Sequence, residues 1–303
     1  MSSAQNMVWL NGAIQPASEA RIDPRDRGFL LGDGLFETIL AVDGRAPLVS
    51  RHLARLASSA EVLGTSIPYA STDLSRALSE VLEVNGFAGG TAALRLTLSR
   101  GVGPRGLVPS PDSRPSVLIS AADHPGPLGL PSDAALRLNL STLRVNASSP
   151  LRRHKTLSYL ENVLARREAE AQGADEALLF HTDLRVAEAS AANLFASIEG
   201  ALWTPAVEEG ALPGITRALV LELAGEAGLV TRETRVGLAD LASASEVFLT
   251  NSLMGLRPVV SLGGLPQMSD LVWSGERPVM EGLQARYLAK VGLPSRDVVS
   301  ESE

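Results

Sequence analysis

The first third of the chain alternates short apolar runs with turn residues, a pattern typical of antiparallel strands. VWLNGAI (8–14) predicts a β-hairpin, because its central Asn-Gly dipeptide supplies the positive φ angles of a two-residue turn. LFETILAV (35–42) predicts a strand that ends at an Asp-Gly turn, and APLV (46–49) predicts the strand that returns from it. TAALRLTLS (91–99) and VLISA (117–121) predict two further strands.

Two segments between these strands have the apolar spacing of amphipathic helices. The first helix is expected to begin at Ser50 and to stop at Gly64, and the second is expected over 73–85. Their apolar positions recur every three or four residues: Leu53, Leu56, Ala57, Ala60 and Leu63 in the first, and Leu74, Leu78, Val81 and Leu82 in the second. The first part of the chain therefore combines an antiparallel sheet with helices.

A dense cluster of Pro, Gly and Ser divides the chain. DHPGPLGLPSD (123–133) lies between two apolar stretches and has the composition of an interdomain linker. We therefore expect a small N-terminal domain over 1–122 and a large C-terminal domain over 134–303.

The second part mixes strands and helices without the regular alternation of a doubly wound sheet. The pattern predicts strands near 135–142, 176–180, 184–188, 193–198, 201–205, 230–236, 246–250 and 257–262, and helices near 157–172, 214–227 and 278–291. The helix near 157–172 carries an apolar stripe of Leu157, Leu160, Val163 and Leu164. The predicted class is α+β in two domains.

Composition narrows the functional classes. The 303 residues are 45% hydrophobic and carry a net charge of −7 with scattered basic residues, so nucleic acid is not an expected partner. No apolar run is long enough to span a membrane and no signal peptide is evident at the start, which favours a cytoplasmic protein. The chain has no Cys, and its four His are not closely paired, so no metal site is expected.

Lys155 is the first candidate for chemistry. It lies in SSPLRRHKTLSYL, just before a predicted helix and directly after Arg152, Arg153 and His154. Neighbouring cations lower the pKa of an amine, as a lysine that forms a Schiff base requires. A solvated basic turn without any special role is the alternative interpretation.

Two further segments are candidates for binding. Glu188 lies among small residues in VAEASAANLFASI (186–198), where a carboxylate can approach a planar heterocycle and keep its ring nitrogen protonated. ALPGITRALVLELA (211–224) opens a helix after Pro-Gly, and its free backbone N–H groups and the Thr216 hydroxyl form an anion cradle. A hairpin Glu that faces water and an ordinary helix start are the plainer alternatives.

The order of these blocks along the chain resembles the fold-type IV enzymes that depend on pyridoxal 5'-phosphate (PLP). The resemblance runs from DPRDRGFLLGDGLFETILAVDG (23–44) to LTNSLMGLRPV (249–259) and so covers nearly the whole chain. The family includes branched-chain, D-amino acid and (R)-amine aminotransferases and 4-amino-4-deoxychorismate lyases. It implies a two-domain fold with the cofactor between the domains.

The resemblance also implies roles for individual residues. Lys155 matches the Schiff-base lysine, and Tyr159 matches a tyrosine that bonds the cofactor O3'. Glu188 matches the partner of the pyridine nitrogen. The residues that match the phosphate contacts are Arg55 in RHLARL, Ile215 and Thr216 at the helix start, and Ser252 in TNSLMGL. Asn193 matches a position with a supporting structural role. In this scheme Lys155 anchors the cofactor and transfers the substrate proton.

Substrate choice is less clearly implied. Arg105, in the loop GVGPRGL (101–107), matches the arginine that binds the substrate carboxylate in D-amino acid aminotransferases, although a mobile surface arginine is an equal alternative. A Tyr and a His of that carboxylate site correspond here to Phe36 and Leu107. Their loss favours a broad D-amino acid or (R)-amine specificity with a 2-oxo acid as acceptor.

Other functions remain open at this stage. The segments LSRGVGPRGL, ADEALLF, EASAANLF and NSLMGLRPV are at least as similar to the lyases as to the transaminases, whereas LPGITR and Tyr159 favour transamination. A branched-chain amino acid aminotransferase is a further alternative, and so is a scaffold protein that has kept the fold without the chemistry. The family resemblance also implies a homodimer.

Overall fold

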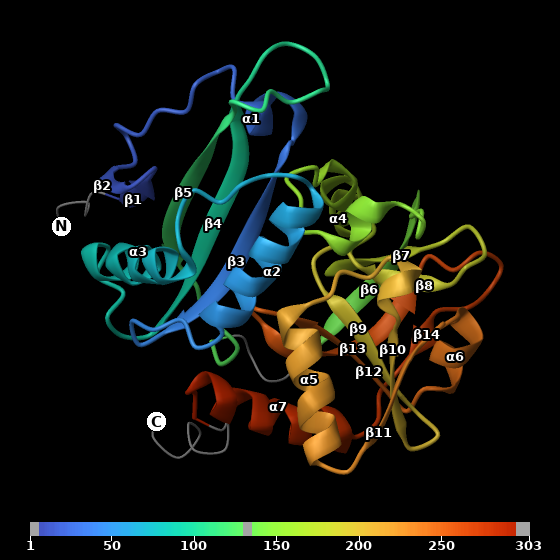
Figure 1. Cartoon of the computed structure of the whole chain (residues 1–303). Coiled ribbons are helices and arrows are strands. Elements are labelled where there is room, and N and C mark those ends of the chain that lie inside the picture. The colour runs from blue at the N-terminus through green and yellow to red at the C-terminus, as the bar shows by residue number, and fades with distance from the viewer. Residues whose placement is uncertain (1–5, 130–134, 295–303) are drawn as a thin grey trace. The chain divides into compact units, whose positions relative to one another are not determined.

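In the computed structural model of the chain, residues 6–129 and 135–294 are described (Figure 1). Their contacts form two compact units: unit 1 comprises Met1–Gly126 and Lys155–Ser158, and unit 2 comprises Pro127–His154 and Tyr159–Glu303. The short segment around Lys155 thus belongs with the N-terminal part of the chain. The predicted linker falls at this division, and its residues 130–134 lie outside the described residues.

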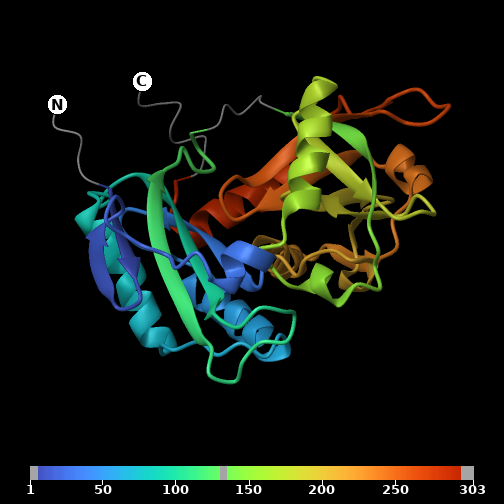
Figure 2. The same ribbon diagram turned by 90° about the horizontal axis from the view of Figure 1, so that it is seen from above.

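Unit 1 is built on an antiparallel five-stranded sheet in the order β2-β1-β5-β4-β3. Its strands are β1 (Met7–Leu10), β2 (Ala13–Pro16), β3 (Gly34–Val42), β4 (Thr91–Val102) and β5 (Arg114–Asp123). Its helices are α1 (Arg27–Leu31), α2 (Val49–Val62) and α3 (Ser71–Val84). Figures 1 and 2 show α2 and α3 against this sheet.

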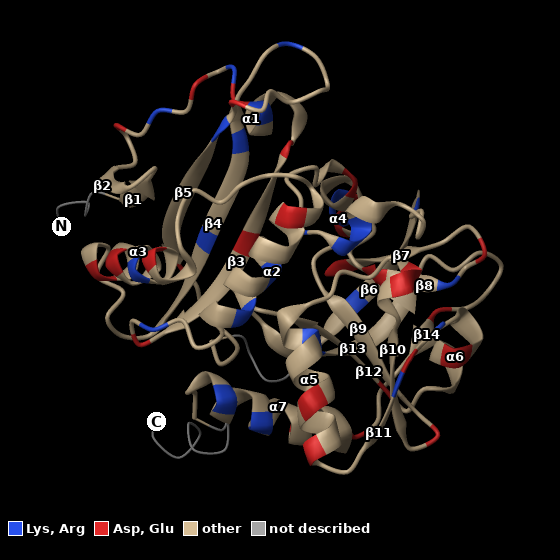
Figure 3. Cartoon of the chain, viewed as in Figure 1, with Lys and Arg blue, Asp and Glu red and all other residues tan. Residues whose placement is uncertain are grey.

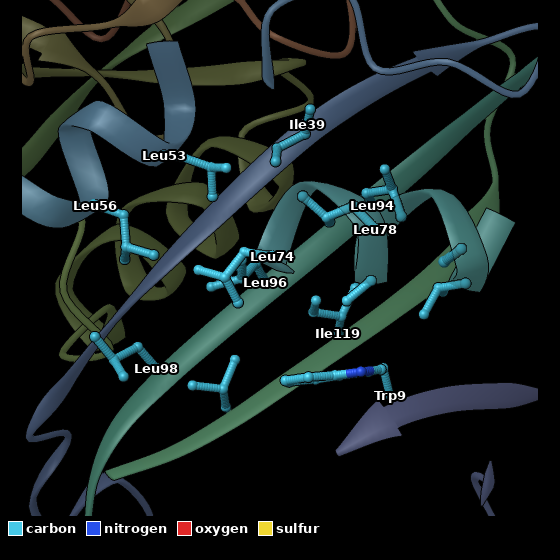
Figure 4. Packing of buried hydrophobic residues seen from close by; sticks show 14 of the residues in the cluster. Trp9, Ile39, Leu53, Leu56, Leu74, Leu78, Leu94, Leu96, Leu98 and Ile119 are labelled. Atoms are coloured by element: carbon cyan, nitrogen blue, oxygen red, sulfur yellow. The ribbon is translucent and has the colours of Figure 1, made fainter. Parts of the chain in front are cut away.

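The core of unit 1 forms where alternate strand residues meet the apolar faces of α2 and α3 (Figure 4). Ile39, Leu96 and Ile119 point to the same face of their three strands and are at most 1% exposed. Leu56 from α2 and Leu78 from α3 pack against them. Each such side chain contributes about 1.5–3 kcal/mol through burial, so this layer holds β3 and α2 in a fixed relation.

Unit 2 is built on a nine-stranded mixed sheet in the order β11-β10-β9-β12-β13-β6-β7-β8, with β14 paired to β13. The strands are β6 (Leu136–Arg144), β7 (Glu176–Phe180), β8 (Val186–Ala189), β9 (Asn193–Ile198), β10 (Ala201–Pro205), β11 (Val230–Thr234), β12 (Glu246–Asn251), β13 (Gly255–Gly263) and β14 (Leu271–Val272). The helices are α4 (Leu160–Ala171), α5 (Ile215–Glu226), α6 (Leu238–Ser243) and α7 (Pro278–Val291), with 3-10 turns η1 (Pro150–Arg153) and η2 (Val207–Glu209).

The α+β class is confirmed, and one predicted strand is wrong. The hairpin at β1 and β2 has positive φ at Asn11 and Gly12, as the Asn-Gly signal predicts. APLV (46–49) forms no strand, because after the turn at Asp43 the chain goes directly into α2, which begins at Val49. The apolar run in APLV was too short to distinguish a strand from the segment that leads into a helix.

The apolar stripe predicted for the helix after Lys155 faces outward on α4, except for its first residue, Leu157, which precedes α4, is half-buried and belongs to unit 1. Leu160 is 69% exposed, Val163 48% and Leu164 44%. The side of α4 that packs on the sheet instead carries small residues, Ala165 and Ala169, which allow the helix to lie close to the strands. The apolar stripe is therefore a surface feature of unit 2.

Acidic and basic side chains are interspersed along both units (Figure 3). Within residues 6–129 and 135–294, no helix has both the length and the apolar character needed to cross a membrane.

Candidate active site

Lys155 is held at the free edge of the sheet in unit 1. The backbone N–H of Phe36 donates to the Lys155 carbonyl at 2.9 Å, and the N–H of Leu157 donates to the Gly34 carbonyl at 2.9 Å. Thr156 lies opposite Leu35 in this short antiparallel bridge. The lysine is thus fixed by pairing with β3, although about 120 residues of chain separate the two segments.

The Phe36 ring contacts two cations. The Lys155 Nζ lies 4.4 Å from the ring centroid, and the Arg95 Cζ lies 4.0 Å from it. Arg95 is on β4, where it pairs with Thr38 of β3 and so points to the same face of the sheet as Phe36. The arrangement places an amine and a guanidinium on one aromatic surface, and cations favour the face of such a ring.

Sequence reasoning missed Arg95. A signal was present, because a charged residue interrupts the apolar alternation of TAALRLTLS at a position that points away from the core. What the sequence alone lacked was the strand register that brings this position beside Phe36.

Arg55 belongs to a buried polar cluster on the opposite face of β3. Its Nε and Nη2 donate to the two carboxylate oxygens of Glu37 at 2.9 and 2.6 Å. The Nδ1 of His52 lies 2.7 Å from the same carboxylate. Glu37 and His52 are each 1% exposed, so α2 and β3 fix the guanidinium in a bidentate ion pair.

The charge states in this cluster follow from burial and partners. Burial raises the pKa of the Glu37 carboxyl, but its bonds to His52 and Arg55 outweigh burial and hold the pKa below its usual range. Burial lowers the pKa of His52, and the charges of Arg55 and Lys155 add to this against the opposing effect of Glu37. At neutral pH we therefore expect an ionised Glu37, a neutral His52 and a cationic Arg55.

The loop with Arg105 and Leu107 lies at the surface of unit 1. Leu107 is 83% exposed, and Arg105 is also exposed. The loop is anchored by Arg27, whose two terminal nitrogens donate to the carbonyls of Gly106 and Leu107 at 2.9 and 2.8 Å. Of the three candidate substrate residues, Phe36 is in contact with Lys155.

Glu188 in unit 2 is a buried carboxylate with donors on both oxygens. Arg152 Nη2 donates to its Oε1 at 3.0 Å, and the backbone N–H of Leu212 donates to its Oε2 at 2.9 Å. Asn193 Nδ2 lies 3.5 Å from Oε2 and donates more closely to the Leu212 carbonyl, at 2.9 Å. Asn193 therefore supports the backbone beside Glu188, as its sequence match implies.

The start of α5 forms a cradle next to this carboxylate. Gly214 is the N-cap residue of α5, and a Cβ at this position would lie 2.0 Å from Asn193 Oδ1. A larger residue there would force the Asn193 side chain to move, so glycine lets the helix begin close to β9. The first N–H groups of Ile215 and Thr216 have no carbonyl partner within the helix, so this end attracts anions.

Thr216 Oγ1 on α5 and Thr250 Oγ1 on β12 are among the buried hydroxyls of unit 2 that have no hydrogen-bond partner in the described residues. Thr216 is 2% exposed and Thr250 1%. Since Thr250 pairs with Asn193, its strand lies next to β9. Ser252 follows in the turn after β12, and Tyr159 precedes α4 as its N-cap residue. Native proteins rarely leave buried hydroxyls unsatisfied, so the two orphans indicate a ligand with acceptor oxygens.

Comparison with known proteins identifies the family. The profile of the family described as amino-transferase class IV matches residues 34–262. The chain belongs to this family. Its members depend on PLP, and the chain is accordingly a PLP-dependent aminotransferase with the fold-type IV architecture.

Relatives within the family have different activities. A putative branched-chain-amino-acid aminotransferase of Methanocaldococcus jannaschii is 35% identical over 85% of this chain and 88% of its own length. A D-alanine aminotransferase of Listeria monocytogenes is 30% identical over 87% and 89%, and an aminodeoxychorismate lyase of Bacillus subtilis is 29% identical over 84% and 86%.

Solved structures are similar over almost the whole chain. The branched-chain aminotransferase of Thermoproteus uzoniensis, crystallised with norvaline, has a TM-score of 0.85 and 26% identity, with 95% of each chain covered. The T.th. branched-chain amino acid aminotransferase with pyridoxamine 5'-phosphate has a TM-score of 0.84 and 29% identity, again with 95% of each chain covered.

The residues present fit PLP. The cofactor carries a phosphate, a pyridine nitrogen and an aldehyde. Unit 2 offers the orphaned Thr216 hydroxyl at a helix N-terminus for the phosphate and the Glu188 carboxylate for the ring nitrogen. Unit 1 offers the Lys155 amine for the aldehyde and the Arg55 guanidinium for the phosphate.

Proposed function

We propose that this aminotransferase takes its amino group from a D-amino acid or an (R)-amine and passes it to a 2-oxo acid. The observation that carries the proposal is the Phe36 ring with Lys155 Nζ and Arg95 Cζ on it. An amine for the amino-group chemistry lies beside a guanidinium for a carboxylate, and both contact the apolar ring of Phe36. Phe36 has no hydroxyl, so an apolar substituent is accepted as readily as a polar one.

The roles of the side chains follow from their chemistry. PLP bound at Lys155 would supply an electron sink that makes the α-hydrogen of the substrate acidic. Lys155 Nζ moves the proton of the reacting carbon. Glu188, whose two oxygens accept from Arg152 and from Leu212 N, would keep a proton on the pyridine nitrogen. Arg55, Ile215, Thr216 and Ser252 hold the phosphate, and Tyr159 bonds the ring hydroxyl.

Two other reactions are supported by particular relatives. The 29% identity to an aminodeoxychorismate lyase supports elimination, in which the same lysine and ring release pyruvate from an enol ether. The 35% identity to a putative branched-chain enzyme supports L-amino acid donors. Sequence similarity does not separate them, because relatives with all three activities have comparable identity.

A half-reaction experiment separates these candidates. The PLP form is mixed with one donor and no acceptor, and conversion to the pyridoxamine form is followed by absorbance. We expect conversion with D-alanine and an (R)-amine, and little with an L-branched-chain amino acid. Conversion with the L-amino acid alone would establish the branched-chain alternative. Pyruvate release from aminodeoxychorismate without any pyridoxamine form would establish the lyase.

Substitutions of Arg95 and Arg105 distinguish carboxylate binding beside the Phe36 ring from carboxylate binding by the loop 101–107. We expect Arg105→Ala to raise the KM for D-amino acids about tenfold, the value of one charge-assisted hydrogen bond, and to leave (R)-amines nearly unchanged. Arg95→Gln should raise the KM for the 2-oxo acid by a similar factor. Steady-state kinetics with both donors measure this, and an equal loss for amines and amino acids would refute a carboxylate role for the arginine concerned.

The homodimer is also part of the proposal. Unit 1 exposes Phe29 by 77% and Leu30 by 60% on α1, and unit 2 exposes the stripe Leu160, Val163 and Leu164 on α4. Large apolar side chains that gather on one helix face are typical of interfaces. Light scattering on the purified protein measures the oligomeric state, and a monomer would contradict the proposal. The cytoplasmic location stays a prediction.

A further inference from the structure

Two buried hydroxyls lie on α5 and α7, two helices that pack against each other. Thr216 on α5 and Tyr287 on α7 are 2% and 0% exposed, and their hydroxyl groups lie close enough for Thr216 to affect the ionisation of Tyr287. Neither oxygen has an aligned hydrogen-bond partner in residues 6–129 and 135–294. A buried hydroxyl without a partner destabilises the fold, so an arrangement that leaves two together needs an explanation.

The position of the Tyr287 ring is closely determined. At Gly255, the first residue of β13, a Cβ would lie 3.0 Å from Tyr287 Cε1, so glycine there makes room for the ring. One helical turn earlier, Gln284 Oε1 accepts from the backbone N–H of Leu256 at 3.0 Å. Since Gly255 also has a φ of 65°, which favours glycine, the start of β13 is shaped to receive α7.

The phenol of Tyr287 keeps its proton. Burial raises the pKa of Tyr287 to about 12, and the contact with Thr216 opposes this only in part. A protonated phenol in a buried position needs an acceptor, and the neighbouring oxygen is that of Thr216. When Tyr287 donates to Thr216 Oγ1, the proton of the threonine hydroxyl is left for another acceptor.

We propose that Tyr287 is a positioning residue for the cofactor phosphate: its hydroxyl donates to Thr216 Oγ1, which then donates to a phosphate oxygen at the N-terminus of α5. The inference rests on the proposed role of Thr216. It adds a residue from α7, a helix beyond residue 262, where the match to the family profile ends. Because each bond in such a chain polarises the next, the tyrosine strengthens a contact that it does not itself make.

The experiment compares ligands with and without a phosphate. Apoprotein is titrated with PLP and with pyridoxal, and the dissociation constants are measured for the wild type, Tyr287→Phe, Thr216→Val and the double variant. Both substitutions remove a hydroxyl and keep the shape. Thr216→Val should weaken PLP about tenfold and Tyr287→Phe about threefold to tenfold, with pyridoxal unchanged in each. In the Thr216→Val background, Tyr287→Phe should have no further effect.

Controls separate positioning from packing. Tyr69→Phe removes a tyrosine hydroxyl from unit 1, where the Tyr69 ring packs edge-on against Trp9, and should leave both dissociation constants unchanged. Thermal unfolding of each apoprotein shows whether the fold is kept.

Three outcomes would overturn the inference. The first is an unchanged PLP affinity in Tyr287→Phe. The second is a loss of affinity in Tyr287→Phe that is equal for PLP and pyridoxal. The third is a double variant in which the effects of Tyr287→Phe and Thr216→Val on PLP affinity add fully. If Thr216→Val leaves the ratio of the PLP and pyridoxal affinities unchanged, Thr216 does not bind the phosphate. The positioning role of Tyr287 then fails as well. If the wild type did not bind PLP at all, that result would instead contradict the proposed function.

Discussion

Lys155→Ala is expected to remove the borohydride-sensitive visible absorbance of the PLP-loaded protein and to lower kcat about 10⁴-fold. Its amine is both the attachment point of the cofactor and the group that moves the substrate proton, and a positioned acid or base alone contributes ~10²–10⁴-fold. The substitution also removes one of the two cations from the Phe36 ring, while Arg95 and the backbone pairing of Lys155 with Phe36 are kept. Absorption spectra and single-turnover kinetics provide the measurements.

The chain offers a matched control for this experiment. It has two lysines, Lys155 and Lys290. Lys290 lies on α7, where its Nζ is 3.9 Å from Glu226 Oε1 and its side chain is 53% exposed. Lys290→Ala should leave the spectrum and kcat unchanged. After borohydride reduction, peptide mass spectrometry should find the cofactor on Lys155. A reduced adduct on Lys290, or a normal visible band in Lys155→Ala, would contradict the assignment.

The contacts of Lys155 also show what the sequence could not predict. The hairpin at β1 and β2, the strand β3 and the helices α2 and α3 were predictable, because turn residues and apolar spacing are local signals. The pairing of Lys155–Ser158 with β3 joins segments more than a hundred residues apart. No local pattern encodes such a pairing, and so the sequence placed Lys155 in the C-terminal domain.

The residues of the candidate site could likewise be predicted only in part. The resemblance supplied Arg55, Glu188 and Thr216 as individual residues. It did not supply the partners that fix them: Glu37 for Arg55, and Arg152 for Glu188. Those partners depend on which face of a strand meets which helix turn. A charged residue inside an otherwise buried strand, such as Glu37 in LFETILAV, was the available signal, because such a group needs a counter-charge.

The second large effect is expected at Glu188. Glu188→Gln should lower kcat roughly 10²–10³-fold, the loss found when one preorganised polar group is removed from an active site. A neutral amide cannot stabilise a protonated pyridine nitrogen, so the ring becomes a weaker electron sink. Affinity for PLP should change far less than kcat, because the phosphate contacts remain. Arg152 would also lose its ionised partner, and we therefore expect a fall in the free energy of unfolding.

Two variants separate these effects. Arg152→Gln leaves Glu188 with its bonds from Leu212 N and Asn193, so kcat should fall by less than tenfold in that variant, well short of the loss in Glu188→Gln. Glu208→Gln alters an exposed carboxylate of η2 and should change nothing. The readouts are kcat, the PLP dissociation constant, and the pH dependence of the absorbance of the bound cofactor, which should differ from the wild type only where Glu188 or Arg152 is changed. If Arg152→Gln reduces kcat as severely as Glu188→Gln while both proteins stay folded, the guanidinium and not the carboxylate is the group on which the ring chemistry depends.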